Sequence, residues 1–211
     1  MRDFDIRLAM KHTTLSKFYQ DDSIVVEELN LPSTGSRIDI AVVNGSFHGY
    51  EIKSSCDTLV RLEKQIESYS KVFDYLSIVT EEKYLQRITL MSPDWVEIIC
   101  VTSLNESIEM VSARKGHFND HKEGFHLARI LRKDEIQSIL TENSIKFKKS
   151  SRAWTLCETL AETLNITELA HSVRLKLKER SDWKLYSRAG LRSSQNDDCG
   201  QFSPRFQHCL V

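Results

Sequence analysis

The chain has 211 residues, of which 40% are hydrophobic and 28% charged, and its formal net charge is -1. This length suits one core domain of ordinary size with an appendage. No stretch approaches the roughly 18 uncharged apolar residues of a membrane span, and the N-terminus lacks the apolar segment of a secretory signal, so we expect a cytoplasmic protein without membrane contact. Five cysteines without CxxC spacing argue against a zinc ribbon or a disulfide framework and suit a reducing compartment.

The spacing of apolar residues predicts an α/β domain with a mixed sheet in the first half of the chain. Turn residues separate the expected strands, notably Asn44-Gly45-Ser46, and Asp57 is placed to begin a helix. In chain order, the expected helices are 3–19, 57–73 and 81–91, and the expected strands are 24–29, 37–43, 47–53, 75–80 and 95–101.

The second half of the chain has a different character. We expect a connecting or sheet-extending segment over 104–132, then helices over 133–142, 151–164 and 166–183. The predicted organisation is a core over 1–103, the open segment 104–132, a basic helical region over 133–192 and a poorly ordered tail over 193–211.

Charge is distributed unevenly along the chain. Residues 143–192 contain eleven Lys or Arg against five Asp or Glu, so an acidic body carries a basic C-terminal region. Residues 161–180 have the cadence of a helix-turn-helix, which favours phosphate contact by basic side chains on its second helix. These side chains are Arg174, Lys176, Lys178 and Arg180. Ordinary antiparallel helices with a solvated basic face are the alternative.

The strands over 37–43 and 47–53 carry the most informative polar residues. Alternate side chains share one face of a strand, so Glu51 and Lys53 project together. If the hairpin loop has three residues, 44–46, Asp39 lies opposite Glu51. A two-residue turn would instead pair Asp39 with Tyr50 and separate the two carboxylates.

Two carboxylates beside an ammonium suit a hard divalent cation. Asp39, Glu51 and the carbonyl of Ile52 would supply oxygen ligands to Mg²⁺, or to Mn²⁺, and Lys53 would lie beside a metal-bound water. This is the chemistry of phosphodiester hydrolysis. The alternative is a cross-strand salt bridge between Lys53 and its two acidic neighbours.

Asp39 followed by Glu51-Ile52-Lys53 on the next strand resembles the PD-(D/E)XK nuclease superfamily. The run from Val25-Val26-Glu27-Glu28-Leu29 through Lys53-Ser54 and Asp57-Thr58-Leu59 to Phe73-Asp74 is similar to a small group of uncharacterised bacterial proteins assigned to it, over roughly residues 1–102. The resemblance implies a restriction-endonuclease-like mixed central sheet flanked by helices. It also implies a magnesium-dependent DNA nuclease.

The same resemblance implies two further site positions. An additional acidic residue is expected on the first helix or strand, where Glu28 is preferred and Glu27 and Asp5 stay open. Gln65 and Tyr69 resemble a QxxxY element and share a helical face, although Tyr69 equally suits the core.

Other candidates are weaker. His117, His121 and His126 lie near Asp120 but without a helix to hold metal-ligand spacing, which favours a polar loop. Cys56 near a helix start is better explained by burial.

The sequence thus predicts a metal-dependent nuclease acting on DNA, with a homodimer or a partner protein left open. The alternative is a catalytically inactive nucleic-acid-binding or regulatory module with the same fold.

Overall fold

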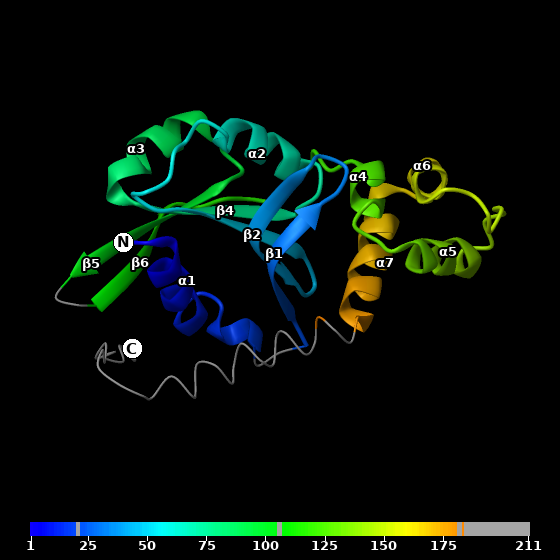
Figure 1. Cartoon of the computed structure of the whole chain (residues 1–211), viewed down its shortest axis with the longest axis horizontal. Coiled ribbons are helices and arrows are strands. Elements are labelled where there is room, and N and C mark those ends of the chain that lie inside the picture. The colour runs from blue at the N-terminus through cyan, green and yellow to red at the C-terminus, as the bar shows by residue number, and fades with distance from the viewer. Residues whose placement is uncertain (20–21, 105–106, 181–182, 184–211) are drawn as a thin grey trace.

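A mixed six-stranded sheet forms the centre of the computed structural model, which describes residues 1–19, 22–104, 107–180 and 183 (Figure 1). The strands are adjacent in sequence order, β1-β2-β3-β4-β5-β6. Their bounds are β1 Ile24–Leu31, β2 Ser36–Val43, β3 Phe47–Lys53, β4 Tyr75–Glu81, β5 Glu97–Leu104 and β6 Ser107–Arg114. The β3/β4 and β4/β5 pairs are parallel and the other pairs antiparallel. The general α/β prediction is therefore confirmed.

The helices divide between the two faces of the sheet and a separate lobe. In Figure 1, α1 lies on one face, α2 and α3 lie on the other, and α4 to α7 form a lobe beside β1 and β2. Their bounds are α1 Asp3–His12, the short 3-10 helix η1 Ser16–Tyr19, α2 Leu62–Ser70, α3 Glu82–Met91, α4 Gly124–Ala128, α5 Lys133–Glu142, α6 Ala153–Thr163 and α7 Ile166–Glu179. No helix within the described residues is long and apolar enough to cross a membrane.

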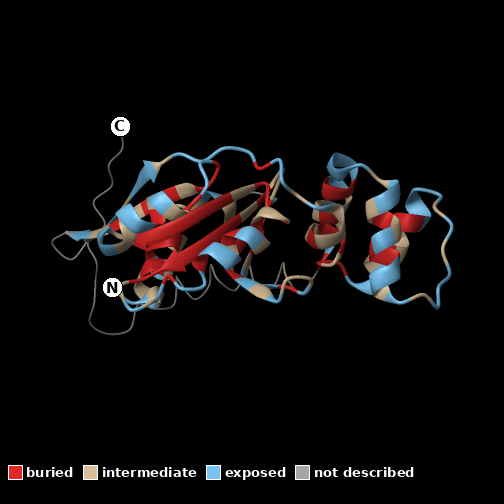
Figure 2. Cartoon of the chain, turned by 90° about the horizontal axis from the view of Figure 1, so that it is seen from above, coloured by how far each residue is buried: buried red, intermediate tan, exposed pale blue. Residues whose placement is uncertain are grey.

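Apolar side chains fill both sides of the sheet, which is why its central strands are buried in Figure 2. Ile6 and Met10 of α1 pack on Ile40 and Val42, whereas Tyr69 of α2 packs on the opposite face. The lobe has its own buried apolar centre, which continues into the α2 side of the core. Burying a Leu or Ile side chain contributes roughly 1.5–3 kcal/mol, so these contacts dominate stability.

The β2–β3 register matches a three-residue loop over 44–46. Val43 pairs with Phe47, and Ile40 pairs with Tyr50. Continuing the same register places Asp39 opposite Glu51 rather than opposite Tyr50. The hairpin geometry expected from the sequence is therefore present.

Two predicted helices are shorter than expected. The helix predicted over 3–19 ends at His12, and a separate 3-10 turn follows. The helix predicted from Asp57 begins only at Leu62, because the Asp57 carboxylate accepts hydrogen bonds from the backbone N–H and hydroxyl of Ser54.

The structure also assigns the segments after β5, for which the sequence predicts less. Segment 104–132 contributes β6 to the sheet and α4 to the lobe. The helix expected over 166–183 is described as far as Glu179, and the tail predicted over 193–211 lies outside the described residues.

One buried carboxylate joins the sheet to the lobe. Asp74 is 3% exposed and accepts a 2.7 Å hydrogen bond from the backbone N–H of Phe47. It also pairs with Lys122 at 2.9 Å and with Arg174 of α7 at 3.3 Å. Without these donors a carboxylate at this depth would be strongly destabilising.

Gly116 provides a test of how tightly the chain packs after β6. A Cβ atom at this position would lie 2.6 Å from both the Glu97 nitrogen and the Trp95 oxygen, which are backbone atoms that cannot rotate away. We expect Gly116→Ala to lower the free energy of unfolding by about 1–3 kcal/mol. Urea denaturation measures this change. Gly45→Ala is the matched control because no atom lies within 4 Å of its Cβ, and equal stability of the two variants would contradict the packing.

Candidate functional site

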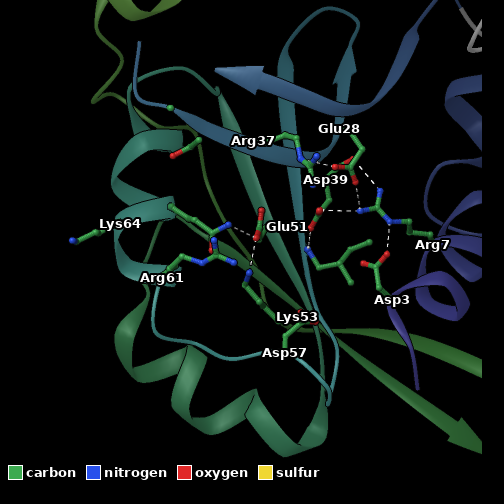
Figure 3. A pocket seen from close by; sticks show the side chains of 14 residues that line it. Asp3, Arg7, Glu28, Arg37, Asp39, Glu51, Lys53, Asp57, Arg61 and Lys64 are labelled. Carbon is green, nitrogen blue, oxygen red and sulfur yellow. Dashed lines mark hydrogen bonds and ion pairs between the residues drawn. The ribbon is translucent and has the colours of Figure 1, made fainter. Parts of the chain in front are cut away.

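A charged cavity of about 620 Å³ opens where α1, the first three strands and α2 meet (Figure 3). Charged side chains of both signs line it. They are Asp3, Arg7, Glu28, Arg37, Asp39, Glu51, Lys53, Asp57, Arg61 and Lys64. The five residues that the sequence predicts to be catalytic, Asp39, Glu51, Lys53, Glu28 and Gln65, all line this cavity.

Glu51 lies deepest, with only 2% of its surface exposed. Its Oε1 accepts hydrogen bonds from Lys53 Nζ at 2.6 Å and Gln65 Nε2 at 2.7 Å. Its Oε2 accepts a 2.7 Å hydrogen bond from the Tyr69 hydroxyl. Burial and then the charge of Glu51 raise the pKa of Tyr69, so this hydroxyl stays protonated and donates. The Glu51 carboxylate is thus satisfied by the protein itself.

Asp39 occupies the neighbouring position on β2. Its Oδ2 accepts a 2.7 Å hydrogen bond from the backbone N–H of Ile52, and its Oδ1 lies 2.9 Å from Arg7 Nη2. Burial and, next, the nearby charge of Glu51 raise the pKa of Asp39 to about 7, although the Ile52 and Arg7 contacts oppose the shift.

Glu28 reaches the cavity through an unusual backbone conformation. Its φ is 55°, in the left-handed region that non-glycine residues rarely adopt, within a strand. Its carboxylate lies 2.6 Å from both Arg7 and Arg37. Of the acidic alternatives, Glu27 instead pairs with Lys11, and Asp5 accepts a hydrogen bond at the start of α1. The geometry therefore selects Glu28 as the additional acidic residue of the cavity.

Arg7 connects the acidic residues of the cavity and was not singled out in the sequence. Its guanidinium contacts Asp3 at 2.6 Å, Glu28 at 2.6 Å and Asp39 at 2.9 Å. The four-residue spacing of Asp3 and Arg7 on a helix was the one signal available. At the mouth of the cavity, Arg61 and Lys64 are exposed and have no partner among the residues that the structure describes.

The predicted magnesium ligands do not fit an ion in this arrangement. Every carboxylate oxygen of Asp39 and Glu51 already faces a protein donor. Within the described residues no group of three or more His, Cys, Asp or Glu side chains could hold a metal ion. Of the salt bridge foreseen as the alternative, between Lys53 and its two acidic neighbours, the pair with Glu51 is present, whereas Asp39 pairs with Arg7. Binding of Mg²⁺ or Mn²⁺ stays a prediction and would require displacement of these donors.

The four basic residues predicted to contact nucleic acid all have acidic partners. Arg174 pairs with Asp74, Lys176 with Glu142 and Lys178 with Asp22. Arg180 is buried and pairs with Glu135 at 2.6 Å, so its role in the lobe is structural. The helix-turn-helix stays a prediction: α6 and α7 are consecutive helices, and the exposed side of α7 carries Glu168 and Glu179.

The histidines considered as metal ligands contact different residues. His126 contacts Ser33 and Glu123, whereas His117 lies beside Asp94. These histidines therefore do not form a common site. Cys56 is exposed rather than buried, which corrects the expectation for this thiol.

Titration of Asp39 gives a pH-dependent contribution to stability. Its pKa is higher in the folded protein, about 7, than the ordinary value of 3.8, so the folded state binds the proton more tightly between these pH values. We expect this contribution to the free energy of unfolding to be lost as pH rises through about 7. Denaturation across this pH range should show a smaller decline in Asp39→Asn than in wild type. The exposed control Asp134→Asn should keep the wild-type slope, and an unchanged slope in Asp39→Asn would contradict the assignment.

Lys53 provides the cation that compensates buried Glu51. Because Lys53→Met leaves that carboxylate without its ion pair, we expect a loss of about 3–5 kcal/mol in the free energy of unfolding. The double variant Lys53→Met/Glu51→Gln should recover part of the loss, since no unpaired charge remains. Chemical denaturation of wild type, Lys53→Met, Glu51→Gln and the double variant measures the coupling, and Lys64→Met is the control at the cavity mouth.

Comparison with known proteins identifies the family. Residues 7–201 match the profile of the family described as Bacteriophage P4 protein cII. The sequence is 25% identical over 180 residues to Protein cII of Enterobacteria phage P4, across 85% of this chain and 68% of that protein. No solved structure matches the chain.

These matches correct the resemblance derived from the short motif. The family that covers almost the whole chain is not described as a nuclease family, so the assignment to the PD-(D/E)XK superfamily is wrong. The metal-dependent nuclease function, with its description as an endonuclease and hydrolase, is wrong for the same reason. The chain belongs to the bacteriophage P4 protein cII family.

Proposed function

We propose that the chain is a catalytically inactive module that binds nucleic acid, with a regulatory rather than an enzymatic role. DNA is the proposed partner, and a restriction-endonuclease-like character of the sheet is part of the proposal. The observation that carries it is a basic loop, defined as residues 143–152 between α5 and α6, whose cations have no acidic partner among the residues that the structure describes.

The basic loop concentrates positive charge without acidic residues. Lys146, Lys148, Lys149 and Arg152 are all exposed, and residues 143–157 contain no Asp or Glu. None of the four side chains has an acidic partner within the described part of the chain. Unpaired cations on a projecting loop suit the phosphate backbone of nucleic acid, which dominates affinity in such complexes.

The loop is well placed for a large ligand. Figure 1 shows the segment between α5 and α6 at the far end of the lobe, away from the sheet. Gln137 donates a 3.1 Å hydrogen bond to the carbonyl of Lys149, which ties the loop to α5. An extended duplex could therefore reach these cations without meeting the body of the protein.

The contrast with α7 supports this assignment. Lys176 and Lys178 already neutralise acidic side chains, so fewer of their charges are available to release counterions from DNA. The same reasoning applies to the cavity, where Lys53 and Arg7 are occupied by carboxylates. Arg61 and Lys64 at the cavity mouth are also exposed, but the basic loop brings four exposed cations together in one short segment.

Salt dependence of DNA binding tests the proposal. We expect replacement of Lys146, Lys148, Lys149 and Arg152 by Gln to weaken binding and to reduce the slope of log affinity against log salt by about 0.9 per lost contact on duplex DNA. Fluorescence anisotropy with a labelled duplex at several salt concentrations gives this slope.

The matched control is Lys176→Gln/Lys178→Gln, which removes two cations of α7 and should change the slope less. A larger change in this control would place the DNA-binding face on α7 and contradict the basic loop. Wild type should leave labelled duplex and single-stranded DNA intact with Mg²⁺ or Mn²⁺. A wild type that binds no DNA at low salt would refute the proposed function.

A further inference from the structure

We propose that the hollow between the sheet and the lobe binds a nucleoside phosphate. This site, called here the interlobe pocket, has a volume of about 380 Å³ and lies between the β2–β3 turn, the segment around Phe118 and the first turn of α7. The residues that line it include Asp74, Tyr75, Phe118, Asp120, Lys122 and Arg174. The inference goes beyond the proposed function, because the pocket contains no residue of the basic loop.

Two aromatic rings form a corner in the interlobe pocket. The Tyr75 and Phe118 ring centroids are 5.8 Å apart with an interplanar angle of 79°. Phe118 is 46% exposed, and Tyr75 is half-buried. A planar base can stack on one ring and meet the edge of the other, which is a sequence-tolerant mode of base binding.

Two cationic side chains, Lys122 and Arg174, line the same pocket. Lys122 Nζ lies over one face of the Phe118 ring, 3.9 Å from its centroid, and it also contacts Asp74 at 2.9 Å and the Asn119 carbonyl at 2.8 Å. Lys122 therefore contributes its charge from below the ring and leaves the rest of Phe118 for a base. Arg174 reaches Asp74 through Nη1 alone. The Nε and Nη2 groups of Arg174 have no hydrogen-bond acceptor among the described residues. They remain available for the fork-like contact that guanidinium makes with phosphate.

Asp74 positions both cations without cancelling them fully. It is buried and shares one negative charge between two positive side chains. Asp120 also lines the pocket and is exposed, so it opposes an anion there. Removal of the Asp120 charge should therefore increase the affinity for an anion, whereas removal of an aromatic ring should decrease it.

The volume and position agree with such a ligand. Pockets for small molecules commonly measure about 300–1,000 Å³ and lie between structural units. A mononucleotide combines a flat base with a phosphate, which matches an aromatic corner beside cations. The same chemistry is offered by a free nucleotide and by the phosphorylated end of a single strand.

Calorimetric titration of the full chain with adenosine monophosphate tests the aromatic corner. We expect wild type to bind this nucleotide more tightly than it binds adenosine or inorganic phosphate. Phe118→Ala should weaken binding about tenfold through the lost stacking. Phe4→Ala is the matched control, because Phe4 is 70% exposed on α1 and lies outside the pocket.

Asp120→Asn tests the placement of the phosphate. Removing a like charge near the anion should raise affinity for adenosine monophosphate roughly threefold at low salt. Asp134→Asn, on exposed α5, should leave it unchanged. Unchanged affinity in Phe118→Ala or in Asp120→Asn would overturn the proposal.

A single-stranded oligonucleotide with a 5′-phosphate distinguishes the two sources. Tighter, Phe118-dependent binding of this strand than of adenosine monophosphate would assign the pocket to strand ends, and the reverse order would assign it to free nucleotides. Absence of Phe118-dependent binding for both probes would refute the pocket. The Gln variant of the basic loop should bind adenosine monophosphate like wild type, so failure of the loop and failure of the pocket are separable.

Discussion

A buried carboxylate requires donors, and this requirement organises the structure. Glu51 is held by Lys53 from its own strand and by Gln65 and Tyr69 from α2. Asp39 is held by Arg7 of α1 and by the backbone of β3. Each carboxylate thereby joins elements distant in sequence, because an unpaired charge at such depth would be far less stable than the same charge in water.

The same principle explains why a convincing motif gave the wrong activity. Asp39, Glu51 and Lys53 do converge, as the hairpin register required. Lys53 pairs with Glu51 and Arg7 pairs with Asp39, so the same convergence is what a stable ionic cluster without a metal ion would show. A short motif indicates which residues lie close together, whereas the match over residues 7–201 shows the family to which the chain belongs.

Ion pairing also decides which charged side chains on the surface are free to contact a ligand. A count of Lys and Arg residues along the sequence indicates α7 as a basic helix. In the folded chain, however, Arg174, Lys176 and Lys178 of α7 pair with acidic residues from three other segments. The basic loop carries fewer basic residues than the whole C-terminal region, but they lack acidic neighbours. Counterion release depends on charges free to contact phosphate, so pairing decides where nucleic acid would bind.

Local pattern was sufficient for much of the fold. Alternating and continuous apolar runs predicted the first five strands, and Asn44-Gly45-Ser46 predicted the turn between β2 and β3, because strand periodicity and turn chemistry act over a few residues. The three-residue form of that loop, one of two that the sequence left open, aligns Asp39 with Glu51. Other features depended on contacts between distant segments. The left-handed backbone of Glu28 accompanies contacts of its carboxylate with Arg7 of α1 and Arg37 of β2.

The partners of the charged side chains could not be predicted in the same way. An ion pair forms where folding brings two charges within a few ångströms, and the sequence does not state which segments meet. Arg7 and Asp39 are 32 residues apart, and Arg174 and Asp74 are 100 apart. The sequence by itself therefore determined the first five strands, the position of the turn between β2 and β3, and the residues of a charged cluster. Only the tertiary structure decided which charges neutralise one another and which remain free, because electrostatic energy depends on distance and burial rather than on order along the chain.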